Sequence, residues 1–126
     1  MQELRAPPTF AETDPAELAH RIVDIATDRK AADIIMLDIR RLITFADYFV
    51  IMSGSGPLQL RALSDNIQQR LKDVGIRAHH VEGSAEDGWV LVDYGSVIVH
   101  IFRPDQRAYY GLEDLWSDAT TVVRIQ

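Results

Sequence analysis

The sequence predicts a single α/β domain, with a mixed sheet of about five strands flanked by helices. Its 126 residues fit one domain and are too few for two of ordinary size. With 47% hydrophobic and 25% charged residues, the chain has the composition of a soluble globular protein, which can bury a core without disulfides or a structural metal. Segments with helical spacing of apolar residues alternate with short apolar runs, and this alternation is typical of α/β folds.

The first helix is predicted to begin after Asp14. Residues 1–13 are polar and contain a Pro-Pro pair, so we expect them to form a flexible lead-in. Asp14 can cap the helix, Pro15 suits its first position, and Glu17 completes a capping box. The helix is expected to end near residues 29–30. Its apolar face is predicted to consist of Leu18, Ile22 and Ile25.

Two apolar runs, residues 34–39 and 47–52, are predicted to be strands. A turn rich in Gly and Ser, residues 53–57, breaks the chain after the second strand. The helix that follows has a single apolar stripe and is expected to end at Gly75, which suits a C-terminal cap. This stripe consists of Leu60, Leu63, Ile67, Leu71 and Val74.

The rest of the chain is predicted to contain further strands and one more helix. A short strand is expected over residues 76–81 and an acidic, glycine-bearing loop over residues 82–88. The last helix is predicted over residues 108–119, and one of its faces carries Tyr109, Leu112, Trp116 and Ala119. The domain is therefore expected to span residues 14–119, with residues 120–126 as a C-terminal tail.

A β-hairpin is the strongest local prediction. Residues 89–94 and 97–102 are joined by Gly95-Ser96, a two-residue loop that is typical of hairpins. Alternation along the two strands then gives two unlike faces. The core face comprises Val90, Val92, Tyr94, Val97, Val99 and Ile101. The other face pairs Trp89 with Phe102, Leu91 with His100, and Asp93 with Ile98. Asp93 also lies diagonal to His100, within reach of a hydrogen bond.

This second face allows two interpretations. A helix can cover it, which makes Trp89 a core residue and leaves Asp93 and His100 to satisfy each other. Alternatively the face binds another protein, since Trp and Tyr anchors are enriched at interfaces. Both hold if the face is covered only in part. Residues 81–94 contain four acids and no Lys or Arg, which would form an acidic collar that favours a basic partner. The four are Glu82, Glu86, Asp87 and Asp93.

Several classes of function are disfavoured by composition. The net charge of -6 argues against a protein whose main role is to grip nucleic-acid phosphates. Without cysteine there is no disulfide, thiolate metal site or Cys nucleophile, and the four histidines lack HExxH spacing, so we expect no metal. No segment has the roughly 18 apolar residues that cross a bilayer, and the N-terminus does not resemble a signal peptide. A cytoplasmic protein is expected.

Enzyme signals are weak. The turn at residues 53–57 lies between a strand and a helix, where backbone N–H groups can bind an anion, but it matches neither GxGxxG nor a P-loop. A nucleotidyl transferase would need two carboxylates one residue apart on a following strand, and none is found. There is no GxSxG motif either. We therefore expect no catalytic residues and no cofactor. A degenerate nucleotide-binding or nucleotidyl-transferase-like domain that uses the turn is the alternative.

Four ordered motifs resemble one known family. They are Ala46-Asp47-Tyr48-Phe49-Val50-Ile51; Glu82-Gly83, followed after five residues by Trp89-Val90-Leu91-Val92-Asp93-Tyr94-Gly95; Val99-His100-Ile101-Phe102; and Arg107-x-Tyr109-Tyr110-x-Leu112-Glu113-x-Leu115-Trp116-Ser117-Asp118-Ala119. On these motifs the chain resembles the ribosomal silencing factors of the Iojap family. The resemblance runs from about Leu18 to Ala119. One departure is Pro57-Leu58, where the family usually has Ser or Thr followed by Arg, so a role of that Arg is not carried over.

The resemblance implies a fold and a function. The family fold is related to nucleotidyl transferases but lacks their catalytic carboxylates. Family members bind large-subunit ribosomal protein fourteen, a basic protein, and thereby block joining of the small subunit when nutrients are scarce. They also keep immature large subunits from engaging, and they often form homodimers when free. The resemblance implies neither a membrane partner nor sequence-specific nucleic-acid binding.

We expect the hairpin and the last helix to bind this partner. Tyr94 faces the core in the predicted register, but its place at the strand end is expected to let its hydroxyl reach solvent. The last helix and one sheet edge are also expected to serve dimerisation and ribosome docking in turn. The predicted partner-binding residues are Trp89, Asp93, Tyr94, His100, Tyr109, Tyr110, Leu115 and Trp116.

Overall fold

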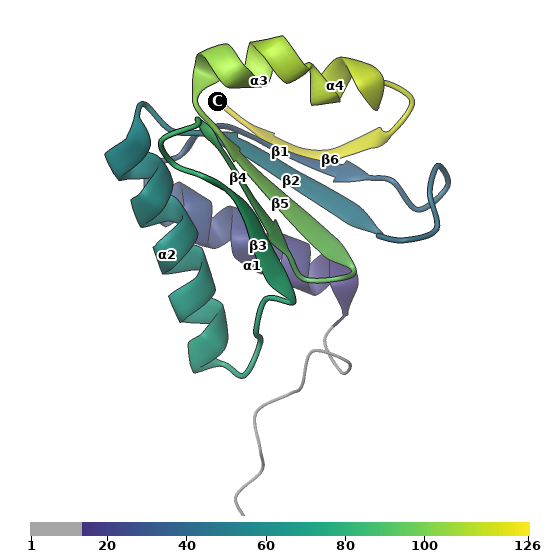
Figure 1. Ribbon diagram of the computed structural model, residues 1–126. Coiled ribbons are helices and arrows are strands. Elements are labelled where there is room, and N and C mark those ends of the chain that lie inside the picture. The colour runs from purple at the N-terminus through teal and green to yellow at the C-terminus, as the bar shows by residue number, and fades with distance from the viewer. Residues whose placement is uncertain (1–13) are drawn as a thin grey trace, which may run out of the picture.

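The computed structural model describes residues 14–126, so the lead-in expected at residues 1–13 lies outside the described part. A mixed six-stranded sheet, in the order β3-β4-β5-β2-β1-β6, has α1 and α2 on one face and α3 and α4 on the other (Figure 1). β2 and β5 are parallel, and all other neighbours are antiparallel. The elements are α1 (Pro15–Asp28), β1 (Ala32–Asp38), β2 (Tyr48–Ser53), α2 (Pro57–Asp73), β3 (His80–Ser84), β4 (Trp89–Asp93), β5 (Val97–Phe102), α3 (Pro104–Tyr110), α4 (Leu112–Leu115) and β6 (Thr120–Ile125). The predicted α/β class and mixed sheet are confirmed.

The two long helices begin and end where the sequence predicts. The Asp14 carboxylate accepts a hydrogen bond from the Glu17 backbone N–H at 3.1 Å, which satisfies one of the free N–H groups at the start of α1. Pro57 occupies the first turn of α2. Gly75 follows the end of α2 with a φ of 87°, a left-handed conformation that glycine adopts without strain.

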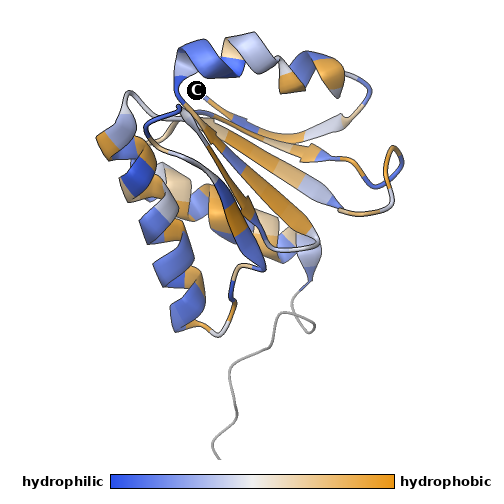
Figure 2. Ribbon diagram, viewed as in Figure 1, coloured by the Kyte–Doolittle hydropathy of each residue, from blue (hydrophilic) through white to orange (hydrophobic). Residues whose placement is uncertain are grey.

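The face of the sheet under α1 and α2 holds the main core. The inward residues of β1, β2, β4 and β5 are almost entirely aliphatic, and they pack against the apolar stripes of both helices (Figure 2). Leu60, Leu63 and Ile67 of α2 have no exposed surface. Burial of each such side chain contributes about 1.5–3 kcal/mol relative to exposure, so this layer supplies most of the driving force for folding.

Three segments differ from the prediction. β3 forms at His80–Ser84, so it shares only residues 80–81 with the strand expected over residues 76–81 and extends into the region expected to be a loop, where it pairs with β4. The predicted helix over residues 108–119 is two shorter helices, since Gly111 adopts a left-handed conformation with φ 59° between them. As a result Tyr109 does not share a buried face with Leu112 and Trp116, and it is 79% exposed.

The sixth strand is β6, at the segment expected to be a tail. It runs antiparallel to β1 and pairs Val123 with Met36 and Arg124 with Ile35, with an irregularity further along the strand. The chain after α4 therefore returns to the sheet and forms its second edge strand. This correction raises the strand number from about five to six.

A half-covered aromatic face as candidate protein-binding site

The second face of the sheet is covered only in part. Leu112 and Trp116, at either end of α4, pack on a second cluster of buried side chains from β1, β2 and β5. At the other side of the sheet, none of the described helices covers β3 on this face, and Trp89 and Leu91 of β4 stay partly exposed (Figure 1). The hairpin register is as predicted, with Trp89 opposite Phe102 and Leu91 opposite His100. The core interpretation therefore holds for one half of this face, and the other half is open to solvent.

Trp89 lies at the boundary between the two halves, and its indole is fixed on several sides. Its Nε1–H donates a hydrogen bond to Nδ1 of His100 at 3.2 Å. Its ring stacks on Phe102 with 5.0 Å between centroids and meets Tyr110 of α3 at 4.3 Å. A side chain held in this way loses little conformational freedom on binding, which favours its use as an anchor.

His100 is buried beneath Trp89. Because Nδ1 accepts the indole hydrogen bond, the neutral ring carries its proton on Nε2, and Nε2 has no hydrogen-bond partner among residues 14–126. Burial away from water lowers the pKa of His100 to about 4, so the ring is neutral near pH 7. The predicted Asp93–His100 hydrogen bond does not form. Asp93 instead accepts from the Gly95 backbone N–H at 2.6 Å and stabilises the hairpin turn.

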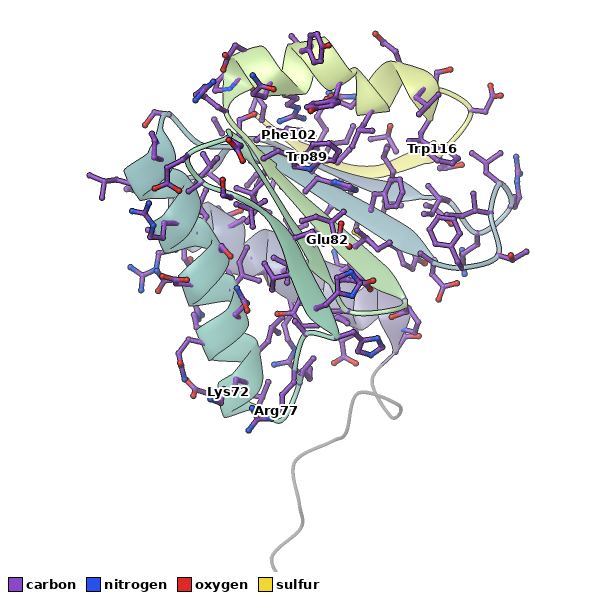
Figure 3. The ribbon with its side chains drawn as sticks, in the orientation of Figure 1. Lys72, Arg77, Glu82, Trp89, Phe102 and Trp116 are labelled. Atoms are coloured by element: carbon purple, nitrogen blue, oxygen red, sulfur yellow. The ribbon has the colours of Figure 1, made fainter. Side chains whose placement is uncertain are left out.

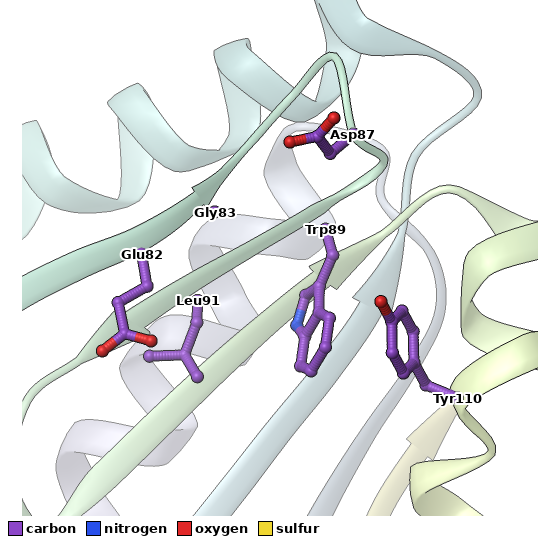
Figure 4. A pocket seen from close by; sticks show the side chains of 6 residues that line it. All are labelled: Glu82, Gly83, Asp87, Trp89, Leu91 and Tyr110. Atoms are coloured by element: carbon purple, nitrogen blue, oxygen red, sulfur yellow. The ribbon is translucent and has the colours of Figure 1, made fainter.

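A pocket of about 280 Å³ opens beside Trp89 (Figure 4). Its floor is apolar, and the carboxylates of Glu82 and Asp87 lie at its border, so it combines aromatic surface with negative charge. The predicted acidic collar is confirmed for these two residues. Glu86, in contrast, pairs with Arg61 of α2. The lining residues are Glu82, Gly83, Asp87, Trp89, Leu91 and Tyr110.

Gly83 shapes the upper wall of this pocket. It has a φ of 79°, and a Cβ at this position would lie 2.2 Å from the carbonyl oxygen of Trp89. Only glycine fits so close to the neighbouring backbone. Gly83 and Leu91 were not predicted as site residues, although both belong to one of the four motifs.

The short helices are held to the sheet by Arg107, which belongs to the fourth motif but was not predicted as a site residue. Its guanidinium donates to Oγ of Ser53 at 2.8 Å and to the carbonyl of Asp33 at 2.7 Å. It also donates to both carboxylate oxygens of Glu113, across the bend at Gly111. These bonds connect α3 to α4, β1 and β2, and thereby set where Tyr110 stands relative to Trp89.

The predicted site residues fall into distinct places. Trp89 and Tyr110 line the pocket, whereas Tyr109 and Leu115 lie on the outer surface of α3 and α4 with 79% and 70% of their surface exposed. Trp116 packs edge-on against Phe49 with 5.6 Å between centroids. Tyr94 is fully buried in the main core, so the expectation that its hydroxyl reaches solvent is wrong. Burial raises the pKa of the Tyr94 phenol, which keeps that group neutral.

The turn at residues 53–57 makes internal hydrogen bonds. The Gly54 N–H donates to the carbonyl of Phe102 at 2.9 Å, and the Ser55 N–H donates to Oε1 of Gln59 at 2.7 Å. The Ser53 hydroxyl is engaged by Arg107. The donors that a nucleotide phosphate would need at Gly54 and Ser55 are therefore already occupied by the protein itself.

Two other kinds of site are absent from residues 14–126. No three His, Asp or Glu side chains in this part of the chain lie close enough together to share a metal ion. Among the helices of the same residues, none combines the length and the apolar character needed to cross a bilayer.

Comparison with known proteins gives consistent matches. The family described as "Ribosomal silencing factor during starvation" matches residues 12–126. A protein named ribosomal silencing factor RsfS from Halalkalibacterium halodurans is 38% identical over 106 residues, which cover 84% of this chain and 91% of that protein. The mouse protein named "Mitochondrial assembly of ribosomal large subunit protein 1" is 31% identical over 76% of this chain and 43% of its own length. A crystal structure from Chromobacterium violaceum superposes with a TM-score of 0.80 at 32% identity, covering 88% of this chain and 94% of that one.

Proposed function

The chain belongs to the family of ribosomal silencing factors, and from this premise we propose that it represses translation by docking on the large ribosomal subunit through ribosomal protein fourteen. The bound factor then blocks the small subunit from joining. The observation that carries the proposal is the open half of the aromatic face. There a fixed indole and a tyrosine ring lie beside two carboxylates, in a pocket that no part of residues 14–126 fills.

The chemistry of this face fits a basic protein. Trp89 and Tyr110 offer apolar surface that gains from being covered, and Glu82 and Asp87 attract cationic side chains. Complementary charge raises the rate of encounter and suppresses acidic partners, while the aromatic anchors supply most of the affinity. Ribosomal protein fourteen, the partner implied by the family resemblance, is basic.

Repression in this proposal is steric. A domain of 14.2 kDa bound on the surface that meets the small subunit occupies volume that the small subunit needs. No bond is made or broken, so the protein acts without catalysis or a cofactor. The same occlusion would keep an immature large subunit out of translation, in line with the name of the mouse relative. A factor acting on ribosomes in this way works in the cytoplasm.

We further propose that the free protein forms a homodimer through α4 and the sheet edge at β6. Leu115 on α4 and Val122 on β6 are exposed apolar residues, 70% and 43% respectively. β6 is the outermost strand, whose free edge can pair with another strand. Light scattering of the free protein and chemical cross-linking on large subunits test this. A dimer that dissociates on binding supports shared use of the surface, and a dimer that stays intact on the subunit contradicts it.

The experiment for the main proposal is sedimentation with separated and mixed ribosomal subunits. The wild-type protein should migrate with the large subunit alone and reduce the yield of joined ribosomes. Trp89→Ala should weaken binding at least thirtyfold, since a desolvated aromatic anchor is worth about 2 kcal/mol or more. Leu58→Ala, which removes an exposed side chain on α2, is the control and should bind as wild type. Wild-type protein that stays at the top of every gradient would overturn the proposal.

A further inference from the structure

A second cleft, of opposite charge, lies at the edge of the sheet between β3 and the C-terminal half of α2. It has a volume of about 300 Å³ and is lined by Gln68, Lys72, Arg77, Ala78, His80 and Val81. Figure 3 shows Lys72 and Arg77 close together at this end of α2. None of the described residues that line the cleft carries a carboxylate, in a protein whose net charge is -6.

The two cations of this cleft have no partner among the described residues. Within residues 14–126, six arginines form salt bridges, such as Arg61 with Glu86 and Arg70 with Asp28, whereas Lys72 and Arg77 make neither a salt bridge nor a side-chain hydrogen bond. The third polar group, His80, is held by Glu82 at 2.8 Å and stands 3.7 Å from Asp93. Lys72 and Arg77 are thus available to bind an external anion, whereas His80 interacts with the carboxylates of Glu82 and Asp93.

The cationic cleft and the proposed docking face lie on either side of the edge strand β3. His80 and Val81 line the cleft, and the next residue along β3, Glu82, lines the aromatic pocket. At about 3.3 Å per residue along a strand, the two sites lie within about 7 Å of each other along the backbone. A partner that covers the pocket and extends past the edge at β3 therefore brings its own surroundings against Lys72 and Arg77.

We propose that Lys72 and Arg77 bind backbone phosphates of ribosomal RNA beside the docked protein partner. This rests on the proposed function, because docking there is what places RNA near the cleft. The protein surface would then match a junction on the subunit, with acids and aromatic rings toward basic protein and cations toward RNA. Two cations recognise phosphate charge and position, so the contact is not sequence-specific.

The test compares a double variant with a matched control. Lys72→Gln with Arg77→Gln removes the two cleft charges. Arg29→Gln with Lys30→Gln removes one Arg and one Lys that also lack salt bridges. The control pair lies far from the cleft. The carbonyl of Lys30 accepts a hydrogen bond from Gln59, which stands 13 residues before Lys72, a distance of roughly 20 Å along α2. Both variants lose two positive charges, so only the place of the charge differs.

Binding is measured on intact large subunits and on isolated ribosomal protein fourteen, each over a range of salt concentrations. The cleft variant should bind intact subunits about tenfold more weakly at low salt. Its plot of log affinity against log salt should be flatter by about 1.5, since each phosphate contact contributes a slope of roughly 0.7–0.9. Its affinity for the isolated protein, and both affinities of the control, should match wild type.

Two outcomes would overturn the inference. In the first, the cleft variant binds intact subunits with wild-type affinity and wild-type salt slope. In the second, the variant loses affinity for isolated ribosomal protein fourteen to the same extent as for intact subunits. The second outcome would show that the two cations contact protein and not RNA. Failure of the proposed function gives a different result, because wild type itself would then not bind the isolated protein and Trp89→Ala would have no effect.

Discussion

The two faces of the sheet are built from alternate residues of the same strands, yet they differ in composition and cover. The face under α1 and α2 is aliphatic and closed, whereas the face under α3 and α4 is aromatic and half open. In β5, Val99 and Ile101 point to the first face, and His100 and Phe102 point to the second. We infer from this comparison that the closed face stabilises the fold and that the open face serves the proposed docking to a protein partner.

The largest expected effect is on the closed face. Leu63 has no exposed surface, and Leu63→Ala should lower the free energy of unfolding by about 3 kcal/mol, because it leaves a cavity between α2 and the sheet. Urea denaturation measures this. Large-subunit binding by the fraction that remains folded should stay at the wild-type level. Weakened binding at full folding would mean that the two faces are not independent.

The open face should make stability depend on pH through His100. Its pKa is about 4 in the folded protein and about 6.5 in an unfolded chain, so the unfolded chain binds more protons between these values. The contribution of neutral His100 to the free energy of unfolding is fully present above pH 6.5. It is lost as the pH drops toward 4, by about 3 kcal/mol in all. Denaturation of wild type and His100→Gln from pH 7 to pH 4 gives the difference. The variant should lose less stability on acidification, and parallel curves would contradict this account of His100.

The open face also tests how far binding is concentrated at the pocket. Tyr110 meets Trp89 at 4.3 Å and lines the pocket, while its neighbour Tyr109 points outward with 79% of its surface exposed. Tyr110→Ala should weaken large-subunit binding about tenfold, and Tyr109→Ala should weaken it about threefold or less, as for residues around a central anchor. Titration of labelled protein against large subunits compares them. A larger effect at Tyr109 would move the interface to the outer surface of α3.

Local patterns predicted the closed face and the hairpin well. The Gly95-Ser96 turn and strict alternation fixed the register of β4 and β5, and an apolar stripe with a cap fixed α2. These features depend on residues close in sequence. They were sufficient because a one-residue slip would turn every core side chain to the wrong face.

The open face depends on contacts that are distant in sequence, and there the prediction was incomplete. β6 is stabilised by pairing with β1, about 85 residues earlier, which the short run Thr120–Ile125 does not reveal. Arg107 is bonded to Glu113 across the break at Gly111, and it also reaches the distant Asp33 and Ser53. The diagonal position of Asp93 and His100 predicts a hydrogen bond between them, but Nδ1 of His100 accepts its hydrogen bond from the Trp89 indole instead.

The smallest expected effect separates charge from shape at the edge of the open face. Asp93 is half-buried and accepts a hydrogen bond from the Gly95 N–H, and an asparagine oxygen can accept the same bond. Asp93→Asn should therefore keep the melting temperature while removing one negative charge that faces a basic partner. We expect about threefold weaker binding at low salt and no difference at high salt, because a surface charge is screened there. If Asp93→Asn and wild type bind with equal affinity at every salt concentration, Asp93 serves only to stabilise the hairpin turn. The acidic contribution to docking would then come from Glu82 and Asp87 beside Trp89.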